Sequence, residues 1–165
     1  RGPPIVQLLL KYGADPNVRV RCVANSDSEK TASTGATPLH FAARKGHIEV
    51  IEALVLSGGS ASEPDSYGRT PLQEAAFNGH EQCARCLLQL APQKGNSPSA
   101  HAVQDDFGMT ALHWAVMGGH APCITVLKGT NASAANDKHR QGDIAAAQKI
   151  VEFGDRQHLQ PSLRT

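Results

Sequence analysis

Apolar residues recur at helical spacing in two short blocks that follow each other along the chain. In the first block, Leu39, Ala42 and Ala43 stand at positions i, i+3 and i+4, which places them on one face of a helix. A second helix is expected to begin near His47, and four aliphatic residues share one of its faces: Val50, Ile51, Leu54 and Val55. The pattern predicts two short antiparallel helices that approach closely through small side chains.

Capping signals stand at the ends of both predicted helices. Thr37 is suited to the N-cap, and Pro38 follows at the first helical position, where its missing N–H costs nothing. Gly46 can end the first helix in a left-handed conformation, and the pair at 58–59 ends the second. The two helices therefore form one helix-turn-helix unit.

This unit repeats along the chain. The sequence G-A-T-P-L-H begins at Gly35, returns as G-R-T-P-L-Q at Gly68, and returns again as G-M-T-A-L-H at Gly108. A Gly-His pair follows each copy. The first two copies begin 33 positions apart and the next two 40 positions apart, so the later interval carries seven extra residues. Because one unit cannot bury its apolar face alone, neighbouring units must stack.

The repeated motif, followed by an aliphatic helix and G-A-D-x-N, resembles the ankyrin repeat over roughly residues 1–154. The resemblance implies an all-α repeat solenoid, in which stacked helix-turn-helix repeats carry β-hairpin-like finger loops. The predicted organisation is a partial repeat at 1–19, an insertion at 20–31, repeats at 32–64, 65–104 and 105–136, a degenerate repeat at 137–154 and a disordered tail at 155–165.

The first repeat matches only the second half of the family pattern, over residues 5–17. We therefore expect this chain to be a fragment of a longer one, with a face at its N-terminal end that lacks its cover. Extension of the chain at that end is expected to raise the melting temperature.

Composition and charge exclude several classes of function. The net charge of +1 creates no general field that would attract nucleic acid or an anionic membrane. No run of about 18 apolar residues is present, so no membrane insertion is expected. Without a secretory signal, the expected location is intracellular, in the cytoplasm or the nucleus.

The histidines and cysteines are interpreted as structural. The resemblance implies that the motif histidines His40 and His113 bond the nearby threonine and backbone, and that Gln73 keeps only part of this network. Cys83 and Cys86 form a C-x-x-C inside a second helix, at apolar packing positions, which favours buried thiols over a zinc or redox site.

Signatures of catalysis are missing from the sequence. No phosphate-binding loop, nucleophile elbow or kinase motif occurs. Asp105 is the first of a carboxylate pair, yet it opens a repeat as Asp65 does, so turn formation is its expected role. We predict no enzyme activity, no cofactor, no metal and no small-molecule substrate.

The remaining candidate is a protein-binding surface. In ankyrin repeats, partners usually meet the finger turns and the concave face of the inner helices. Carried over to this chain, the predicted partner-binding residues are Arg44, Lys45, Tyr67, Arg69, Phe77, Asn78, Asp106, Phe107, Met109 and Met117. Neighbouring positions on the same surface are Ser33, Thr34, Ala36, Ser66 and Gly118.

That surface is rich in aromatic and Met side chains, which are typical of interface cores, although the chain has only seven aromatic residues. Arg44, Lys45 and Arg69 are expected to form a basic rim suited to a partner with apolar anchors and some acidic residues. Phe41 and Trp114 are interpreted as packing residues.

The predicted function is a scaffold or adaptor that binds an unidentified protein. One alternative is a binding module of a larger enzyme, such as a kinase, a ubiquitin ligase or an acyltransferase, with catalysis outside this chain. Another alternative is a structural spacer or a channel's cytoplasmic domain. The insertions at 20–31 and 91–104 fit recognition loops and tolerated disorder equally well.

Overall fold

The computed structural model describes residues 4–20, 35–90 and 100–129. Its helices are α1 (Pro4–Lys11), α2 (Pro38–Lys45), α3 (Ile48–Leu56), α4 (Pro71–Phe77), α5 (Glu81–Leu90), the short 3-10 helix η1 (Ala100–Ala102), α6 (Ala111–Met117) and α7 (Ala121–Gly129). No strand occurs within these three ranges. Most of the predicted insertion at 20–31, the degenerate repeat and the tail lie outside them, as do Cys22, Ser33 and Thr34.

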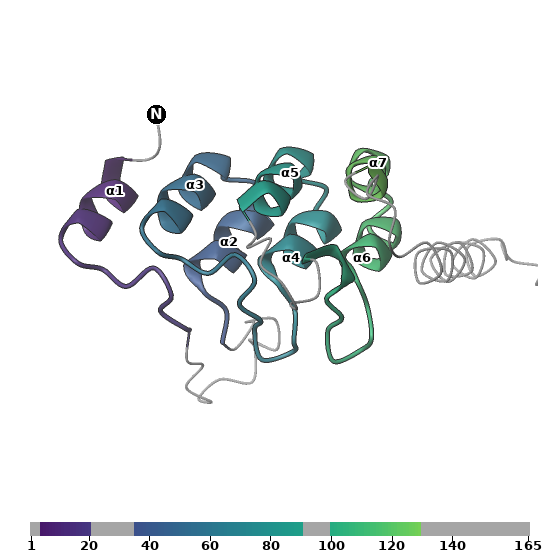
Figure 1. Cartoon of the computed structure of the whole chain (residues 1–165), viewed down its shortest axis with the longest axis horizontal. Helices are drawn as coiled ribbons and strands as arrows, with labels where there is room; N and C mark the ends of the chain where they lie inside the picture. Colours follow the sequence, from purple (N-terminus) through teal and green to yellow (C-terminus); the bar gives the residue numbers. More distant parts are fainter. Residues whose placement is uncertain (1–3, 21–34, 91–99, 130–165) are drawn as a thin grey trace, which may run out of the picture.

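The helices form two parallel layers (Figure 1). Helices α2, α4 and α6 make an inner layer, and α1, α3, α5 and α7 make an outer layer. Within each full repeat an inner helix packs on the outer helix that follows it, and each layer also packs from repeat to repeat. The turns that join the repeats project beyond the inner layer (Figure 1). The predicted all-α repeat solenoid is confirmed.

The helix ends follow the predicted capping signals. Thr37 is the N-cap of α2 in extended conformation, and Pro38 is its first residue. The main-chain N–H of Thr37 donates to Nδ1 of His40 at 3.1 Å, so a ring nitrogen satisfies an amide at the start of the helix. Gly46 ends α2 at φ +75°, a left-handed conformation that a side chain rarely adopts.

Small residues form the contact between inner helices. Ala42 and Ala43 of α2 are buried, as are Ala75 and Ala76 of α4. Leu39 and Leu72 belong to the same buried core cluster, and Leu112 packs against it. Because alanine adds little bulk, helices with few large side chains still exclude water from a thin core.

The finger turns are organised by two aspartates. Oδ1 of Asp65 accepts from the N–H groups of Tyr67 and Arg69, both at 2.9 Å. Asp105 does the same one repeat later, as its predicted role in turn formation requires. The main-chain N–H of Asp106 donates to the main-chain oxygen of Tyr67 at 3.1 Å, and this hydrogen bond connects one finger turn to the next.

Candidate partner-binding face

The inner helices present two columns of side chains. The fourth residues of α2, α4 and α6 form one column, and the seventh residues form the other. We call this surface the inner face, and its residues are Phe41, Glu74 and Trp114 in the first column and Arg44, Phe77 and Met117 in the second. Each fourth residue from α4 onward contacts the seventh residue of the preceding helix: Glu74 contacts Arg44, and Trp114 contacts Phe77.

The half of the inner face between α2 and α4 is ionic. Arg44 donates to both carboxylate oxygens of Glu74, at 3.0 and 3.1 Å. The guanidinium of Arg69 also pairs with two carboxylates: Nη1 lies 3.3 Å from Oε1 of Glu74, and Nη2 lies 2.9 Å from Oδ2 of Asp65. Both carboxylates are buried, and the hydrogen bond to Glu74 raises the pKa of Arg44. Two buried negative charges therefore hold two partly exposed positive charges in place.

This pairing corrects the predicted basic rim. The charges of Arg44 and Arg69 are balanced by Glu74 and Asp65, so they do not form a free positive surface. Of the three residues in that prediction, Lys45 is exposed.

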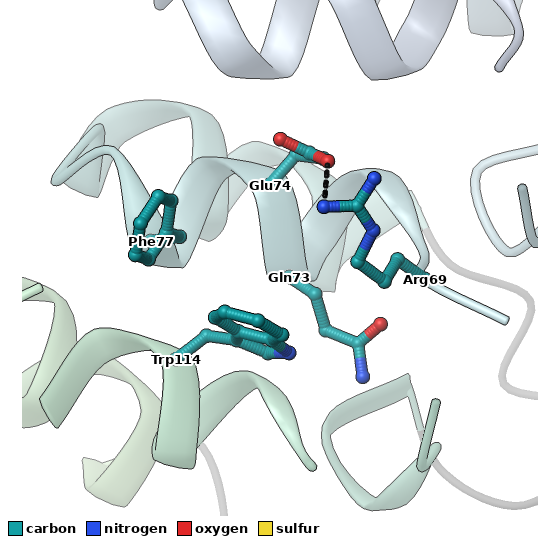
Figure 2. Close-up of a pocket in the computed structure, with 5 residues that line it drawn as sticks. All are labelled: Arg69, Gln73, Glu74, Phe77 and Trp114. Carbon is teal, nitrogen blue, oxygen red and sulfur yellow. Dashed lines mark ion pairs between the residues drawn. The ribbon is translucent and has the colours of Figure 1, made fainter. Parts of the chain in front are cut away.

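The half between α4 and α6 is aromatic. The rings of Phe77 and Trp114 meet edge to face, with centroids 5.3 Å apart and planes at 83°. The indole Nε1 of Trp114 donates to Oδ2 of Asp105 at 2.8 Å, which anchors the ring to the finger turn. A shallow depression with room for no more than about one water molecule lies beside these rings, and Figure 2 shows its lining residues: Arg69, Gln73, Glu74, Phe77 and Trp114.

The predicted binding residues divide by exposure. Those that reach solvent most freely are Lys45, Tyr67, Phe77, Asp106, Phe107 and Met117. Those that are half-buried are Arg44, Arg69, Asn78 and Met109. The side-chain amide of Asn78 donates to the main-chain oxygen of Glu74 at 2.8 Å. The guanidinium of Arg69 lies 5.1 Å from the centre of the Tyr67 ring.

Two sequence-based assignments of side chains are wrong. Ala36 is fully buried and contributes nothing to the surface. Phe41 is not an interior packing residue: 39% of it is exposed, and the guanidinium of Arg44 lies 5.7 Å from its ring centre. The packing role of Trp114 is confirmed by its contact with Phe77.

The comparison with known proteins agrees with this architecture. A family model described as ankyrin repeats in three copies matches residues 1–98, and another described as ankyrin repeats in many copies matches residues 93–127. The chain belongs to the ankyrin-repeat family. Ankyrin repeats are in general modules for protein–protein interaction.

One curated relative is Protein ACCELERATED CELL DEATH 6 of Arabidopsis thaliana. It is 27% identical to this ankyrin-repeat chain over 124 residues, which cover 75% of the chain. The match spans only 15% of the relative's own length.

The buried motif residues connect successive ankyrin repeats. Nε2 of His40 lies 2.9 Å from the oxygen of Arg69, in the finger of the next repeat. Gln73 takes the place of His40 one repeat later: its Oε1 accepts from Thr70 N at 2.7 Å. Its Nε2 donates to the oxygens of Met109 and Val103, at 2.7 and 3.1 Å. The prediction that glutamine keeps only part of the network is therefore wrong, since the two amide hydrogens reach two carbonyls.

The cysteines of the ankyrin repeats are buried thiols, as predicted. Cys83, Cys86 and Cys123 are free and lie in the core. Burial raises the pKa of Cys83 to about 11 and also raises the pKa of the other two. Within the described part of the chain, no cluster of three side chains capable of binding a metal is found.

The sequence reasoning missed the carboxylates of the inner face. Glu74 stands at the position that Phe41 and Trp114 occupy in the other repeats, so a charge interrupts an aromatic column. That mismatch was the available signal for a buried ion pair. In the part of the chain that the structure covers, no helix combines the length and the apolar character needed to cross a membrane.

Proposed function

We propose that this chain binds another protein through its inner face and finger turns, as an intracellular scaffold or adaptor. The observation that carries the proposal is the apolar surface around α4 and α6. Phe77 and Met117 are 43% and 49% exposed beside Trp114, and Phe107 on the neighbouring finger is 68% exposed. Aromatic and Met side chains are the groups that bury most productively at the centre of an interface.

The ion pairs of the inner face make charged groups on the partner unnecessary at this position. Because Arg44, Arg69, Glu74 and Asp65 satisfy one another, a partner gains little from charges placed opposite them. The segment that fits is one whose apolar side chains pack on Phe77, Phe107 and Met117, the exposed apolar side chains of this surface.

Peptides selected from a random display library against the chain test this surface. Affinity is measured from the fluorescence of Trp114, which is the single tryptophan of the chain and lines the depression. Phe107→Ala and Phe77→Ala are each expected to weaken binding by about tenfold or more, as loss of a central anchor does.

Leu56→Ala is the matched control. Leu56 is 85% exposed but lies on outer helix α3, away from the inner face, so its loss should leave affinity unchanged. Binding that depends on Leu56 and tolerates both phenylalanine changes would place the site on the outer layer and refute the proposal.

A further inference from the structure

Two exposed aromatic rings of the proposed binding surface belong to different elements. Phe77 is the last residue of inner helix α4, and Phe107 lies in the finger turn that begins at Asp105. Both side chains are exposed. A partner that contacts both rings must match the distance between them, so the contacts that fix this distance decide which partners fit.

Trp114 of α6 touches both of these elements. Its ring meets that of Phe77 edge to face, with centroids 5.3 Å apart (Figure 2), and its Nε1 donates to Oδ2 of Asp105 at 2.8 Å. The other oxygen of this carboxylate, Oδ1, accepts from the main-chain N–H groups of Phe107 and Met109, at 3.0 and 2.8 Å. An unbroken series of contacts therefore runs from one exposed ring to the backbone that carries the other.

The carboxylate in the middle of this series is held firmly. Asp105 is 6% exposed, so its hydrogen bonds are shielded from water. An indole N–H can only donate, and the carboxylate oxygen opposite it accepts, so the bond has one possible direction. The indole therefore fixes the carboxylate, and the carboxylate fixes the turn that carries Phe107.

The other end of the series is also fixed. The main-chain oxygen of Phe77 lies 2.9 Å from Nε2 of His120, within hydrogen-bonding distance. A Cβ at Gly118 would come within 2.5 Å of the same oxygen, so the residue that follows α6 lies directly against the end of α4. With Phe77 held in this way, the position of Phe107 relative to it depends on Trp114.

The preceding finger turn is built differently. Oδ2 of Asp65 accepts from the guanidinium of Arg69, which belongs to the same turn. Glu74 occupies the position of Trp114, and it reaches that turn through Arg69. The direct bond from an inner helix to the aspartate is therefore a feature of the turn with Phe107, and the turn with Asp65 offers a natural comparison.

We infer that Trp114 is a specificity-determining residue that sets the separation of Phe77 and Phe107. The partner that it selects is a segment with two apolar side chains at one matching separation. This inference rests on the proposed function, because it concerns the same surface. A turn that is already ordered raises the affinity for a matching segment and excludes segments whose apolar side chains are spaced differently.

Trp114→Phe tests the link to the turn. The change keeps an aromatic ring beside Phe77 and removes the N–H that Asp105 accepts. The main-chain amides of Phe107 and Met109 should then exchange with solvent about tenfold faster or more, because the turn opens more easily. A tryptophan analogue with sulfur in place of the indole N–H, introduced at this single tryptophan, keeps the shape of the ring and should give the same result even if Trp114→Phe does not fold.

The preceding turn is the internal control for this experiment. The N–H groups of Tyr67 and Arg69 bond Asp65 in the same way, and their exchange should not change. Unchanged exchange at Phe107 in both variants would overturn the inference. Equal acceleration in the two turns would also overturn it, because the whole stack would then have loosened. This measurement needs no partner.

Peptide selection measures the effect on specificity. A random display library should yield peptides with two apolar residues at one spacing from the natural chain, and at several spacings from Trp114→Phe. The best peptide of the natural chain, labelled for fluorescence polarisation, should bind Trp114→Phe about tenfold more weakly. In a Phe107→Ala background the same change should alter affinity by less than about twofold, because no ring is left to position.

The possible outcomes separate the inference from the proposed function. Equal losses of affinity in the two backgrounds would mean that the indole contacts the peptide itself, and would overturn the inference. The same range of spacings from both selections would do so as well. If amide exchange responds as expected but no selected peptide depends on Phe77 or Phe107, the proposed function is refuted, and the specificity role with it. The bond between Trp114 and the turn would then remain established on its own.

Discussion

The imidazole Nε2 of His40 and the main-chain oxygen of Arg69 lie 2.9 Å apart, across the boundary between two repeats. The same ring accepts from the N–H of Thr37 through Nδ1. One neutral imidazole therefore caps its own helix and fixes the finger of the next repeat. A proton on Nδ1 would remove the acceptor that Thr37 requires.

Acid should destabilise the fold through this histidine. Burial lowers the pKa of His40 below its ordinary value of 6.5, so below that pH the unfolded chain binds a proton that the folded chain resists. The free energy of unfolding therefore keeps its full value above about pH 6.5. It falls as the pH drops below that value, by at most about 1.4 kcal/mol per pH unit for one proton.

His40→Gln should weaken this pH dependence, because Gln73 shows that an amide performs the same bonding without titrating. Urea unfolding above and below the ordinary histidine pKa measures the difference. Gln73→His is the converse variant and should steepen the pH dependence. Equal pH profiles for the natural chain and His40→Gln would show that other groups dominate.

Loss of the buried carboxylate of Glu74 should cost far more stability than loss of a surface one. Glu74→Gln removes the negative charge that Arg44 and Arg69 share and one of its two acceptor oxygens, and hydrogen bonds to charged groups contribute about 1.5–3 kcal/mol each. We expect a loss of about that size. Glu81→Gln removes the exposed pair with Arg85 and should cost less than about 0.5 kcal/mol. Similar losses in denaturant titrations of both variants would contradict this account.

Gly46→Ala should destabilise the chain for two separable reasons. Its φ of +75° is strained for alanine, which costs about 1 kcal/mol, and the new Cβ would press on the His80 ring. Gly58→Ala isolates the first cost, since Gly58 has φ +92° and no described atom within 4 Å of the added Cβ. Thermal unfolding should place Gly46→Ala clearly below Gly58→Ala, and the reverse order would disprove the contact with His80.

The three core thiols should react only when the protein unfolds. With the pKa of Cys83 near 11, about one molecule in a thousand carries the thiolate at about pH 8, and burial blocks access as well. In a Cys22→Ser background, a thiol-reactive disulfide dye should label no cysteine in the native protein and three in concentrated denaturant. Rapid labelling of the native protein would mean that α5 opens readily.

The sequence was sufficient for the parts of the fold that depend on local chemistry. Thr37 and Pro38 fix a helix start, Gly46 fixes its end, and the 33-residue recurrence of this pattern predicts the stack. Each signal acts within a few residues of itself, so one chain without its structure reveals it.

The inner face was less predictable because its contacts join residues about 30 positions apart. Arg44 was expected to be a free cation, but Glu74 meets it from the next inner helix, 30 positions along the chain, and the same carboxylate also pairs with Arg69 of its own repeat. Whether Gln73 reaches one carbonyl or two depends on where the next finger lies. Distances of this kind are set by the stacking of repeats and are absent from spacing alone.

The side chains that join the repeats each reach one neighbour and no further: His40 and Gln73 reach the following finger, and His80 and His120 the preceding helix. A pulling force along the stack must therefore pass through these joints in series. Under tension the molecule should lengthen in steps of about one repeat, and each detached unit should rejoin the stack by itself when the load is released.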